Sequence, residues 1–357
     1  MRLLPLLLAA QLAGSTLAAS PIAGDHRLFV AAESADEVYQ LHFDGKDLTV
    51  EEVIEVGYMA TEIEGPHGLT VSPDGAHWFV TMAHGKPWGV LYKYETGTNQ
   101  LVGECELGLF PATMQLSEDT GLLYVVNFDL HGDMTPSSVS IVDVDAMVEV
   151  ERTTTGAMPH GSRLSPDGAR HYSCAMMDDE LIELDAAGFD VLRRLRLGDG
   201  AGGFTRPRDG GHHSVSKPTW VQPHPDGKHA YVALNGAHQV VAVDLESWKI
   251  VRRMPTDKAP YNLDITPDGT RLVVTHKGRQ SIGVWDLETG KELERLATTK
   301  RVPHGVVIEP GGRYAFVSSE SIGADPGAVD VYDLETLEHV ASREVGLQAG
   351  GIAYWTR

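Results

Sequence analysis

Cysteine is scarce in this chain of 357 residues, which contains only two. A scaffold held together by several disulfides is therefore excluded. The strand pattern described below places Cys105 on an outer strand of one repeat and Cys174 on an inner strand of another. A disulfide requires Cα atoms within about 7 Å of each other, and these positions are further apart. We therefore expect two free thiols.

Positive charge is also scarce, because 29 Lys and Arg residues stand against 50 Asp and Glu residues, for a formal net charge of −21. This balance argues against nucleic acid or an anionic membrane surface as a partner, since both bind through basic patches. A metal ion, a small molecule or another protein remains possible as a partner. We expect the protein to act as a monomer.

Long apolar runs are missing after the first 20 residues. The one such run, Leu3–Ala10, follows Arg2 and gives way to small residues up to Ala19. This order predicts a secretory signal peptide over residues 1–19. A membrane anchor fits less well, because the run is shorter than the roughly 20 residues that span a bilayer. We expect no membrane insertion, and export to the periplasm or the extracellular space.

Local catalytic signatures are absent as well. The sequence has no Gly-x-Ser-x-Gly nucleophile turn, no phosphate-binding loop, no Cys-x-x-Cys-His haem attachment and no His-Glu-x-x-His zinc motif. Each of these would bring a known mechanism with it. Any site must therefore be assembled from residues that are distant in the sequence.

The chain does contain an internal repeat of about 40 residues, the period of a four-stranded propeller blade. Each unit has a turn such as Ser72–Gly75 or Ser165–Gly168, in which Pro presets φ and Gly supplies a positive φ. A strand rich in β-branched and aromatic residues follows, as in Tyr124–Asn127. Short strands at regular spacing, without helical periodicity between them, indicate an all-β protein.

Seven strand starts can be counted along the chain. They are Gly65-Pro66, Phe110-Pro111, Met158-Pro159, Lys217-Pro218, Ala259-Pro260, Val302-Pro303 and the degenerate Gln348–Gly351. The last start opens a strand at the end of the chain, whereas the first unit begins with Leu28–Ala31 and lacks a first strand. We therefore predict a single domain over residues 20–357. It is a seven-bladed β-propeller of four-stranded blades, in which the C-terminal strand completes the first blade and closes the ring.

These blades resemble those of the YVTN family of β-propeller repeats, as Tyr124-Val125-Val126-Asn127 and its relatives downstream of Ser-Pro-Asp-Gly turns show. The resemblance covers nearly all of the chain after residue 19. It implies a seven-bladed, often secreted or periplasmic protein, but no single activity. A weaker similarity, carried by Pro-His-Gly before a Pro-Asp-Gly turn, links the chain to streptogramin-lyase propellers. Several lactonases are also propellers.

The tripeptide Pro-His-Gly opens three of the repeats and places His67, His160 and His304 at equivalent strand starts. The first strand of a blade lies beside the central channel, so these imidazoles should surround one channel mouth. Neutral imidazole is the commonest protein ligand for transition metals. Duplication of a blade could also have copied the motif without any function.

Further histidines are predicted on the same face, in loops that follow second strands and in a long glycine-rich connection over residues 198–216. The candidate ligand-binding residues are His67, His160, His304, Tyr261, Trp220, His212 and His213. The candidate metal ligands are His67, His160, His304, His84, His131 and His276, for copper or zinc. The favoured function is an exported module that binds a ligand, a metal ion or a partner protein at this mouth. The alternative is a metal- or His-dependent hydrolase, such as a lactonase, or a lyase that uses the same face.

Overall fold

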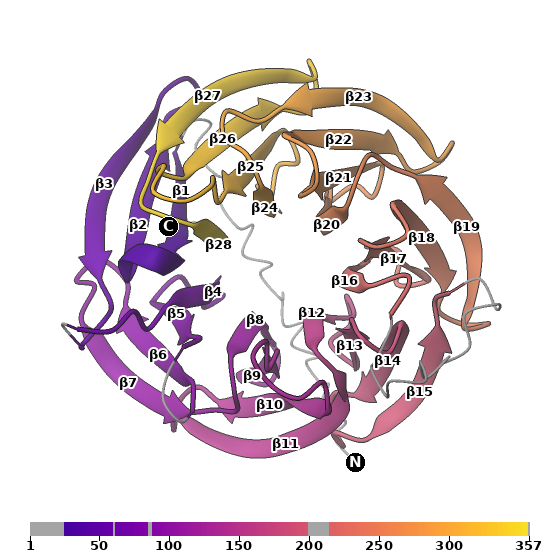
Figure 1. Cartoon of the computed structure of the whole chain (residues 1–357), viewed down its shortest axis with the longest axis horizontal. Helices are drawn as coiled ribbons and strands as arrows, with labels where there is room; N and C mark the ends of the chain where they lie inside the picture. The colour runs from indigo at the N-terminus through magenta and orange to yellow at the C-terminus, as the bar shows by residue number, and fades with distance from the viewer. Residues whose placement is uncertain (1–24, 60, 85–87, 199–213, 356–357) are drawn as a thin grey trace, which may run out of the picture.

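The repeats form a closed ring of seven four-stranded antiparallel sheets, shown as a computed structural model in Figure 1. The structure describes residues 25–59, 61–84, 88–198 and 214–355. The predicted signal peptide and most of the 198–216 connection lie outside these ranges. The prediction of an all-β, seven-bladed propeller is confirmed.

Blade 1 combines the last strand of the chain with the first three, and each of the next three blades is formed by four consecutive strands. Blade 1 contains β28 (Ala349–Trp355), β1 (His26–Ala32), β2 (Glu37–Phe43) and β3 (Leu48–Glu55), with the short 3-10 helix η1 (Glu33–Ala35) after β1. Blade 2 contains β4 (Pro66–Val71), β5 (His77–Met82), β6 (Val90–Glu95) and β7 (Leu101–Glu106). Blade 3 contains β8 (Pro111–Leu116), β9 (Leu122–Asn127), β10 (Pro136–Asp143) and β11 (Val148–Ala157). Blade 4 contains β12 (Pro159–Leu164), β13 (Arg170–Ala175), β14 (Glu180–Asp185) and β15 (Val191–Arg196).

The last three blades follow the same order from the channel outwards. Blade 5 contains β16 (Pro218–Pro223), β17 (His229–Leu234), β18 (Gln239–Asp244) and β19 (Lys249–Pro255). Blade 6 contains β20 (Pro260–Ile265), β21 (Arg271–His276), β22 (Ser281–Asp286) and β23 (Lys291–Ala297). Blade 7 contains β24 (Pro303–Ile308), β25 (Tyr314–Ser319), β26 (Ala328–Asp333) and β27 (Glu338–Glu344).

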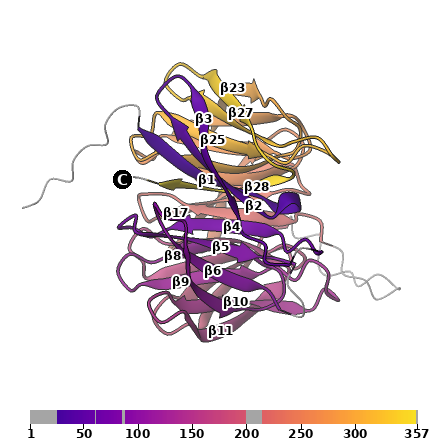
Figure 2. The ribbon, with the colours of Figure 1, turned by 90° about the vertical axis from the view of Figure 1, so that its left-hand side faces the viewer.

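The two ends of the chain share blade 1, as the missing first strand predicted. Strand β28 pairs antiparallel with β1, with Arg27 opposite Trp355 and Phe29 opposite Ala353. In the side view of Figure 2, η1 lies at one face of the ring and β28 points towards the other. This pairing removes the open sheet edge that a linear array of blades would expose.

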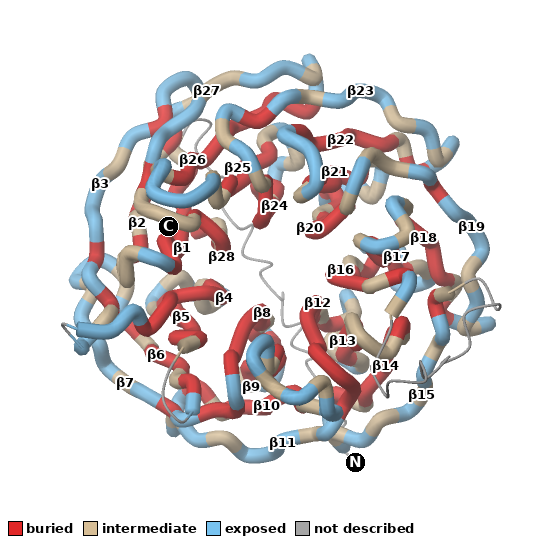
Figure 3. Tube along the Cα trace, in the orientation of Figure 1, coloured by how far each residue is buried: buried red, intermediate tan, exposed pale blue. Residues whose placement is uncertain are grey.

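The core lies between neighbouring blades, and the outermost strands are the most exposed (Figure 3). Between blades 1 and 2, the Phe29 ring stacks on Trp78 with centroids 5.0 Å apart, and Trp78 stacks on Tyr94 at 4.1 Å. Full burial of a large apolar side chain contributes about 1.5–3 kcal/mol. Cys105 and Cys174 are buried in two separate clusters and both are free, as expected. Among the residues described, no helix is long and apolar enough to cross a membrane.

One backbone turn recurs before every first strand. The residue that precedes the strand has a positive φ in all seven blades, namely Gly65, Phe110, Met158, Lys217, Ala259, Val302 and Gln348. Its carbonyl accepts a hydrogen bond from the N–H of the residue that directly follows the second strand, as in Glu33 to Gln348 (3.1 Å) and Lys277 to Ala259 (2.8 Å). Six of these seven residues are not glycine, so each left-handed turn carries a conformational cost of roughly 1–2 kcal/mol. The turn therefore depends on this hydrogen bond and on its packed surroundings.

Buried hydroxyls join the first strands of neighbouring blades. The Thr275 hydroxyl accepts the N–H of Asn262 (3.0 Å) and donates to the carbonyl of His304 in the next blade (3.0 Å). Thr81 makes the equivalent bonds to Gly68 (2.8 Å) and Ala112 (3.1 Å). Each hydroxyl thus satisfies two buried backbone groups that belong to different blades.

We predict that Thr275→Val lowers the free energy of unfolding by about 1–3 kcal/mol, because a buried N–H and a buried carbonyl lose their partner. Urea unfolding followed by tryptophan fluorescence measures this change. The matched control is Thr98→Val, because Thr98 is exposed and its hydroxyl bonds only to exposed groups, the Glu95 carboxylate and, at 3.4 Å, the N–H of Gln100. That control should change the stability by less than about 0.5 kcal/mol. Equal effects of the two variants would contradict the role of the buried hydroxyl.

Candidate functional site

The three Pro-His-Gly histidines occupy the second position of β4, β12 and β24, beside the channel as the repeat predicted. His67, His160 and His304 are all buried. The glycine that follows each one allows the next blade to approach closely. A Cβ on Gly68 would lie 1.9 Å from the carbonyl oxygen of Ala112, and a Cβ on Gly161 would lie 2.7 Å from the Cα of Trp220.

The channel is narrow enough for side chains from distant blades to meet. The rings of His67 and His304 have centroids 5.7 Å apart, and Tyr261 lies 4.7 Å from His304 and 5.0 Å from His160. The sequence suggested that the three histidines would be spread around the channel. They instead form a continuous series of ring contacts in which Tyr261 connects His160 to His304.

His160 is held in one tautomer. Its Nδ1 lies 2.7 Å from the carbonyl oxygen of Thr219, which can only accept, so Nδ1 carries the hydrogen. Its Nε2 is then the acceptor for the Tyr261 hydroxyl at 2.7 Å. Burial, assisted by the nearby His67, lowers the pKa of His160 to about 3. His160 is therefore a neutral, structural imidazole at neutral pH.

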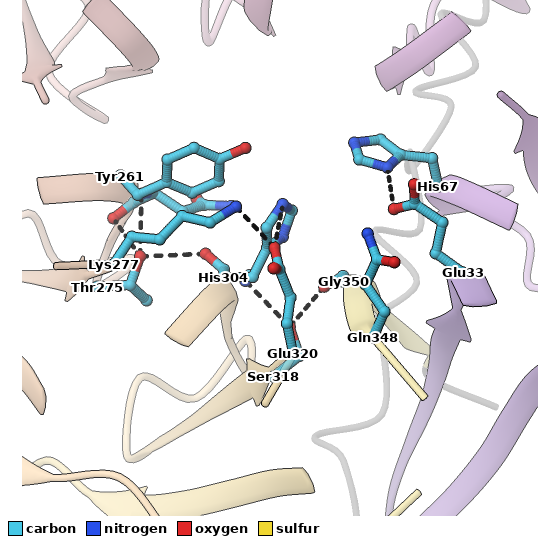
Figure 4. A network of polar contacts seen from close by, with 12 residues as sticks. Glu33, His67, Tyr261, Thr275, Lys277, His304, Ser318, Glu320, Gln348 and Gly350 are labelled. Carbon is cyan, nitrogen blue, oxygen red and sulfur yellow. Dashed lines mark hydrogen bonds and ion pairs between the residues drawn. The ribbon is translucent and has the colours of Figure 1, made fainter. Parts of the chain in front are cut away.

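An ion pair lies on the same side of the channel (Figure 4). The Lys277 ammonium donates to Glu320 at 2.7 Å and lies 4.2 Å from the centroid of the Tyr261 ring. Burial opposes the charge on Lys277, but Tyr261 and Glu320 outweigh this effect and raise its pKa. His304 Nε2 lies 3.6 Å from the same Glu320 carboxylate. Burial and then the Lys277 charge hold the pKa of His304 well below its ordinary value.

Glu33, in η1, binds two histidines at once. One carboxylate oxygen lies 2.8 Å from His67 Nδ1, as Figure 4 shows, and the other lies 3.0 Å from His84 Nε2. Burial would raise the pKa of Glu33, but the charge and hydrogen bond of His67 and the hydrogen bond of His84 bring it down to about 2. A carboxylate only accepts, so His67 Nδ1 and His84 Nε2 each carry a hydrogen. The other nitrogen of each ring, His67 Nε2 or His84 Nδ1, takes no part in this contact.

A pocket of about 720 Å³ opens beside this carboxylate. His84 and His131 line it, with ring centroids 5.9 Å apart, and Asp129 lies on the same wall. The side chain of His84 is 30% exposed, whereas that of His67 is 9% exposed. His84 is therefore the partner of Glu33 that a bound molecule can reach.

A second, smaller cavity of about 50 Å³ lies in the channel. It is lined by His67, Trp220 and Asn262, among others. The His67 Nε2, Trp220 Nε1 and Asn262 Oδ1 atoms are buried there without a hydrogen-bond partner among the residues described. Polar atoms of this kind in a cavity of this size are suited to bound water. Arg163 also lines the cavity, with its guanidinium 4.5 Å from the Trp220 ring centroid.

The remaining candidate residues fall in different places. His131 lines the large pocket. His276 was expected in a loop at the mouth, but it is the last residue of β21 and is buried against Trp285 and Ser281 inside blade 6. His212 and His213 lie outside the described residues. Within the described part of the chain, no group of three or more His, Cys, Asp or Glu residues could hold a metal ion. A copper or zinc site stays a prediction.

Three residues of the channel mouth were not anticipated, namely Glu33, Lys277 and Glu320. All three directly follow a second strand, at the position whose N–H bonds to the left-handed turn. The sequence does carry a signal for them, because they lie in the loops after second strands that also contain the candidate histidines. The charged residues at the equivalent position could have been found by aligning the repeats for any ionisable side chain.

The fold and the site together define the class of protein. It is a closed seven-bladed β-propeller with acidic, basic and imidazole groups at one channel mouth. The sequence model of the family described as "Lactonase, 7-bladed beta-propeller" matches residues 27–325, and the chain belongs to that family. No curated protein sequence matches it.

Solved structures show the same fold at low sequence identity. The periplasmic gluconolactonase PpgL of Pseudomonas aeruginosa superposes with a TM-score of 0.72 at 19% identity, covering 93% of this chain and 99% of that one. A putative 6-phosphogluconolactonase from Bacteroides uniformis gives a TM-score of 0.68 at 14% identity, covering 92% and 99%. Hydrazine synthase of Kuenenia stuttgartiensis gives 0.66 at 21% identity, covering 84% and 92%.

We predict that the folding stability of the protein decreases as the pH falls below about 6.5. In the unfolded chain His160 takes up a proton near that pH, whereas in the folded protein its buried ring stays neutral down to about pH 3. His171 and His276, whose pKa values burial lowers to about 3 and about 4, act in the same direction. Each such group removes at most about 1.4 kcal/mol per pH unit. Urea unfolding between about pH 7 and about pH 5 measures the slope. His160→Asn, which keeps a donor near Nδ1, should reduce that slope, and an unchanged slope would contradict the prediction.

Proposed function

We propose that this protein is a lactonase-type hydrolase whose active site is the pocket beside Glu33. The observation that carries the proposal is the buried Glu33 carboxylate, which holds His84 at the wall of a pocket large enough for a small organic substrate. Membership of the lactonase family and the likeness to two structures named as gluconolactonases support it. These findings favour the hydrolase alternative over the binding module.

His84 is the general base in this proposal. Its Nε2–H donates to Glu33, which fixes the ring and leaves the Nδ1 lone pair to accept a proton from water. Glu33 is an ionised carboxylate at neutral pH, since its pKa is about 2. It therefore stabilises the imidazolium that forms on His84 when the proton arrives, as the carboxylate does in other acid–base pairs.

Hydrolysis then proceeds by two bond changes. The water oxygen forms a bond to the lactone carbonyl carbon, its proton passes to His84, and a tetrahedral oxyanion results. Collapse of this intermediate breaks the bond between that carbon and the ring oxygen. His84 then returns this proton to the leaving alkoxide beside His131, whose ring centroid lies 5.9 Å from that of His84. The product is the open-chain hydroxy acid.

We predict that His84→Gln and Glu33→Gln each lower kcat/KM for lactone hydrolysis by about 10²–10⁴-fold, the usual contribution of a positioned acid or base. In His84→Gln the base is lost. In Glu33→Gln the amide retains the shape of the carboxylate but cannot stabilise the imidazolium. The rate is measured by titrating the acid released from a panel of γ- and δ-lactones.

The matched control is His229→Gln, because His229 pairs with Asp226 at the edge of a different pocket. Its rate should equal that of the parent protein. If the parent binds lactones but hydrolyses none, the protein is a binding module and the proposal is wrong. If His229→Gln lowers the rate as much as His84→Gln, the assignment of the site is wrong.

Export is part of the same proposal, on the strength of the signal pattern over residues 1–19 and the periplasmic location named for the Pseudomonas aeruginosa structure. We predict that the full chain, produced in a Gram-negative host, appears in the periplasmic fraction with Ser20 as its first residue. Leu7→Arg interrupts the apolar run and should keep the protein uncut in the cytoplasm. An uncut parent protein in the cytoplasm would contradict export.

A further inference from the structure

One part of the wall of the large pocket is apolar. Ile63, Leu109 and Phe110 line it together with Ala83. Ile63 and Leu109 are 53% and 40% exposed, while Phe110 is almost completely buried. Phe110 also contacts the rings of His84 and His131, at centroid distances of 4.9 and 5.7 Å. The apolar wall therefore begins directly beside the proposed reacting groups.

Carboxylates are found at this pocket among the residues that the structure describes. Asp129 lines it, and the ionised Glu33 carboxylate lies beside it. The formal charge of the whole chain is −21. A phosphorylated or carboxylated substrate would meet a repulsive potential on approach, since the field of a strongly acidic protein acts over its whole surface.

We propose that the substrate is a neutral lactone that carries an apolar substituent, an alkyl chain or an aromatic ring, rather than a sugar lactone or a phosphorylated one. This inference rests on the proposed function. The lactone ring lies against His84 and His131, and its substituent packs against Phe110, Leu109 and Ile63. A volume of about 720 Å³ accommodates both parts, since pockets of roughly 300–1,000 Å³ bind small organic ligands.

The placement of these residues explains why the substituent contributes to recognition. Binding is favoured when an alkyl chain covers the exposed isoleucine and leucine, because apolar surface of both the protein and the chain is then removed from water. A polyhydroxylated lactone would instead place hydroxyl groups against the apolar wall, where they lose hydrogen bonds to water without replacement. The apolar wall therefore favours alkyl-substituted lactones over polyhydroxylated ones, because only the latter lose hydrogen bonds to water on binding.

The test is a series of γ-lactones with increasing alkyl chains, from γ-butyrolactone through γ-hexalactone and γ-octalactone to γ-decalactone. We expect kcat/KM to rise by about three- to fourfold for each added CH₂ group until the pocket is full. Glucono-δ-lactone and its 6-phosphate should be the poorest substrates. A flat chain-length profile, or faster turnover of the 6-phosphate, would overturn the inference.

Variants locate the effect. Ile63→Ser combined with Leu109→Ser should make kcat/KM nearly independent of chain length. The altered wall has little apolar surface for the alkyl chain to remove from water. Val251→Ser combined with Leu293→Ser is the matched control, since both residues are exposed on outer strands of blades 5 and 6. The control should keep the slope of the parent protein. Loss of the slope in the control would place the recognition elsewhere and overturn the inference.

Failure of the proposed function is distinguished by a direct binding measurement. Isothermal titration of γ-decalactone into Glu33→Gln protein reports on the pocket without any turnover. Binding that the Ile63→Ser, Leu109→Ser pair weakens would support the apolar pocket even if no lactone were hydrolysed. Absence of binding of γ-decalactone, together with binding of the 6-phosphate, would overturn the inference whether or not the protein is an enzyme.

Discussion

The hydrogen bond between the left-handed turn before each first strand and the residue after each second strand organises the whole channel mouth. It occurs in every blade and joins only backbone atoms, so it places no restriction on the two side chains that it positions. One side chain comes from the second residue of the first strand, and the other follows the second strand. The ring thus presents two sets of seven equivalent positions. At one set lie His67, His160, Tyr261 and His304, and at the other lie Glu33, Lys277 and Glu320.

Burial then decides which of these groups can do chemistry. His160 and His304 are neutral because burial lowers their pKa values. Lys277 and Glu320 form an ion pair with each other. A half-satisfied set of buried charges would be costly, so this part of the channel is best understood as a compensated network. Glu33 differs, because one of its two imidazole partners reaches a pocket.

The fold could be predicted from the sequence in nearly full detail, because turn chemistry and strand composition act locally and repeat seven times. The positions of His67, His160 and His304 on first strands could be predicted for the same reason. The contacts among them could not, because the ring distances depend on the diameter of the channel, which no local pattern specifies. The pairing of Glu33 with His67 and His84 was missed because it joins residues 34 and 51 positions apart through blade 1 and blade 2.

The sharing of Glu33 has a chemical consequence for the whole site. Its two oxygens lie 2.8 and 3.0 Å from nitrogens of His67 and His84, so the charge state of either ring acts on the same carboxylate. A proton that arrives on His84 is stabilised most when His67 is neutral, since a second cation would compete for the same negative charge. The side chain of His67 is only 9% exposed, so its contact with Glu33 is shielded from water. The buried histidine of the repeated motif thus supports the exposed one, because it holds in place the carboxylate that contacts His84.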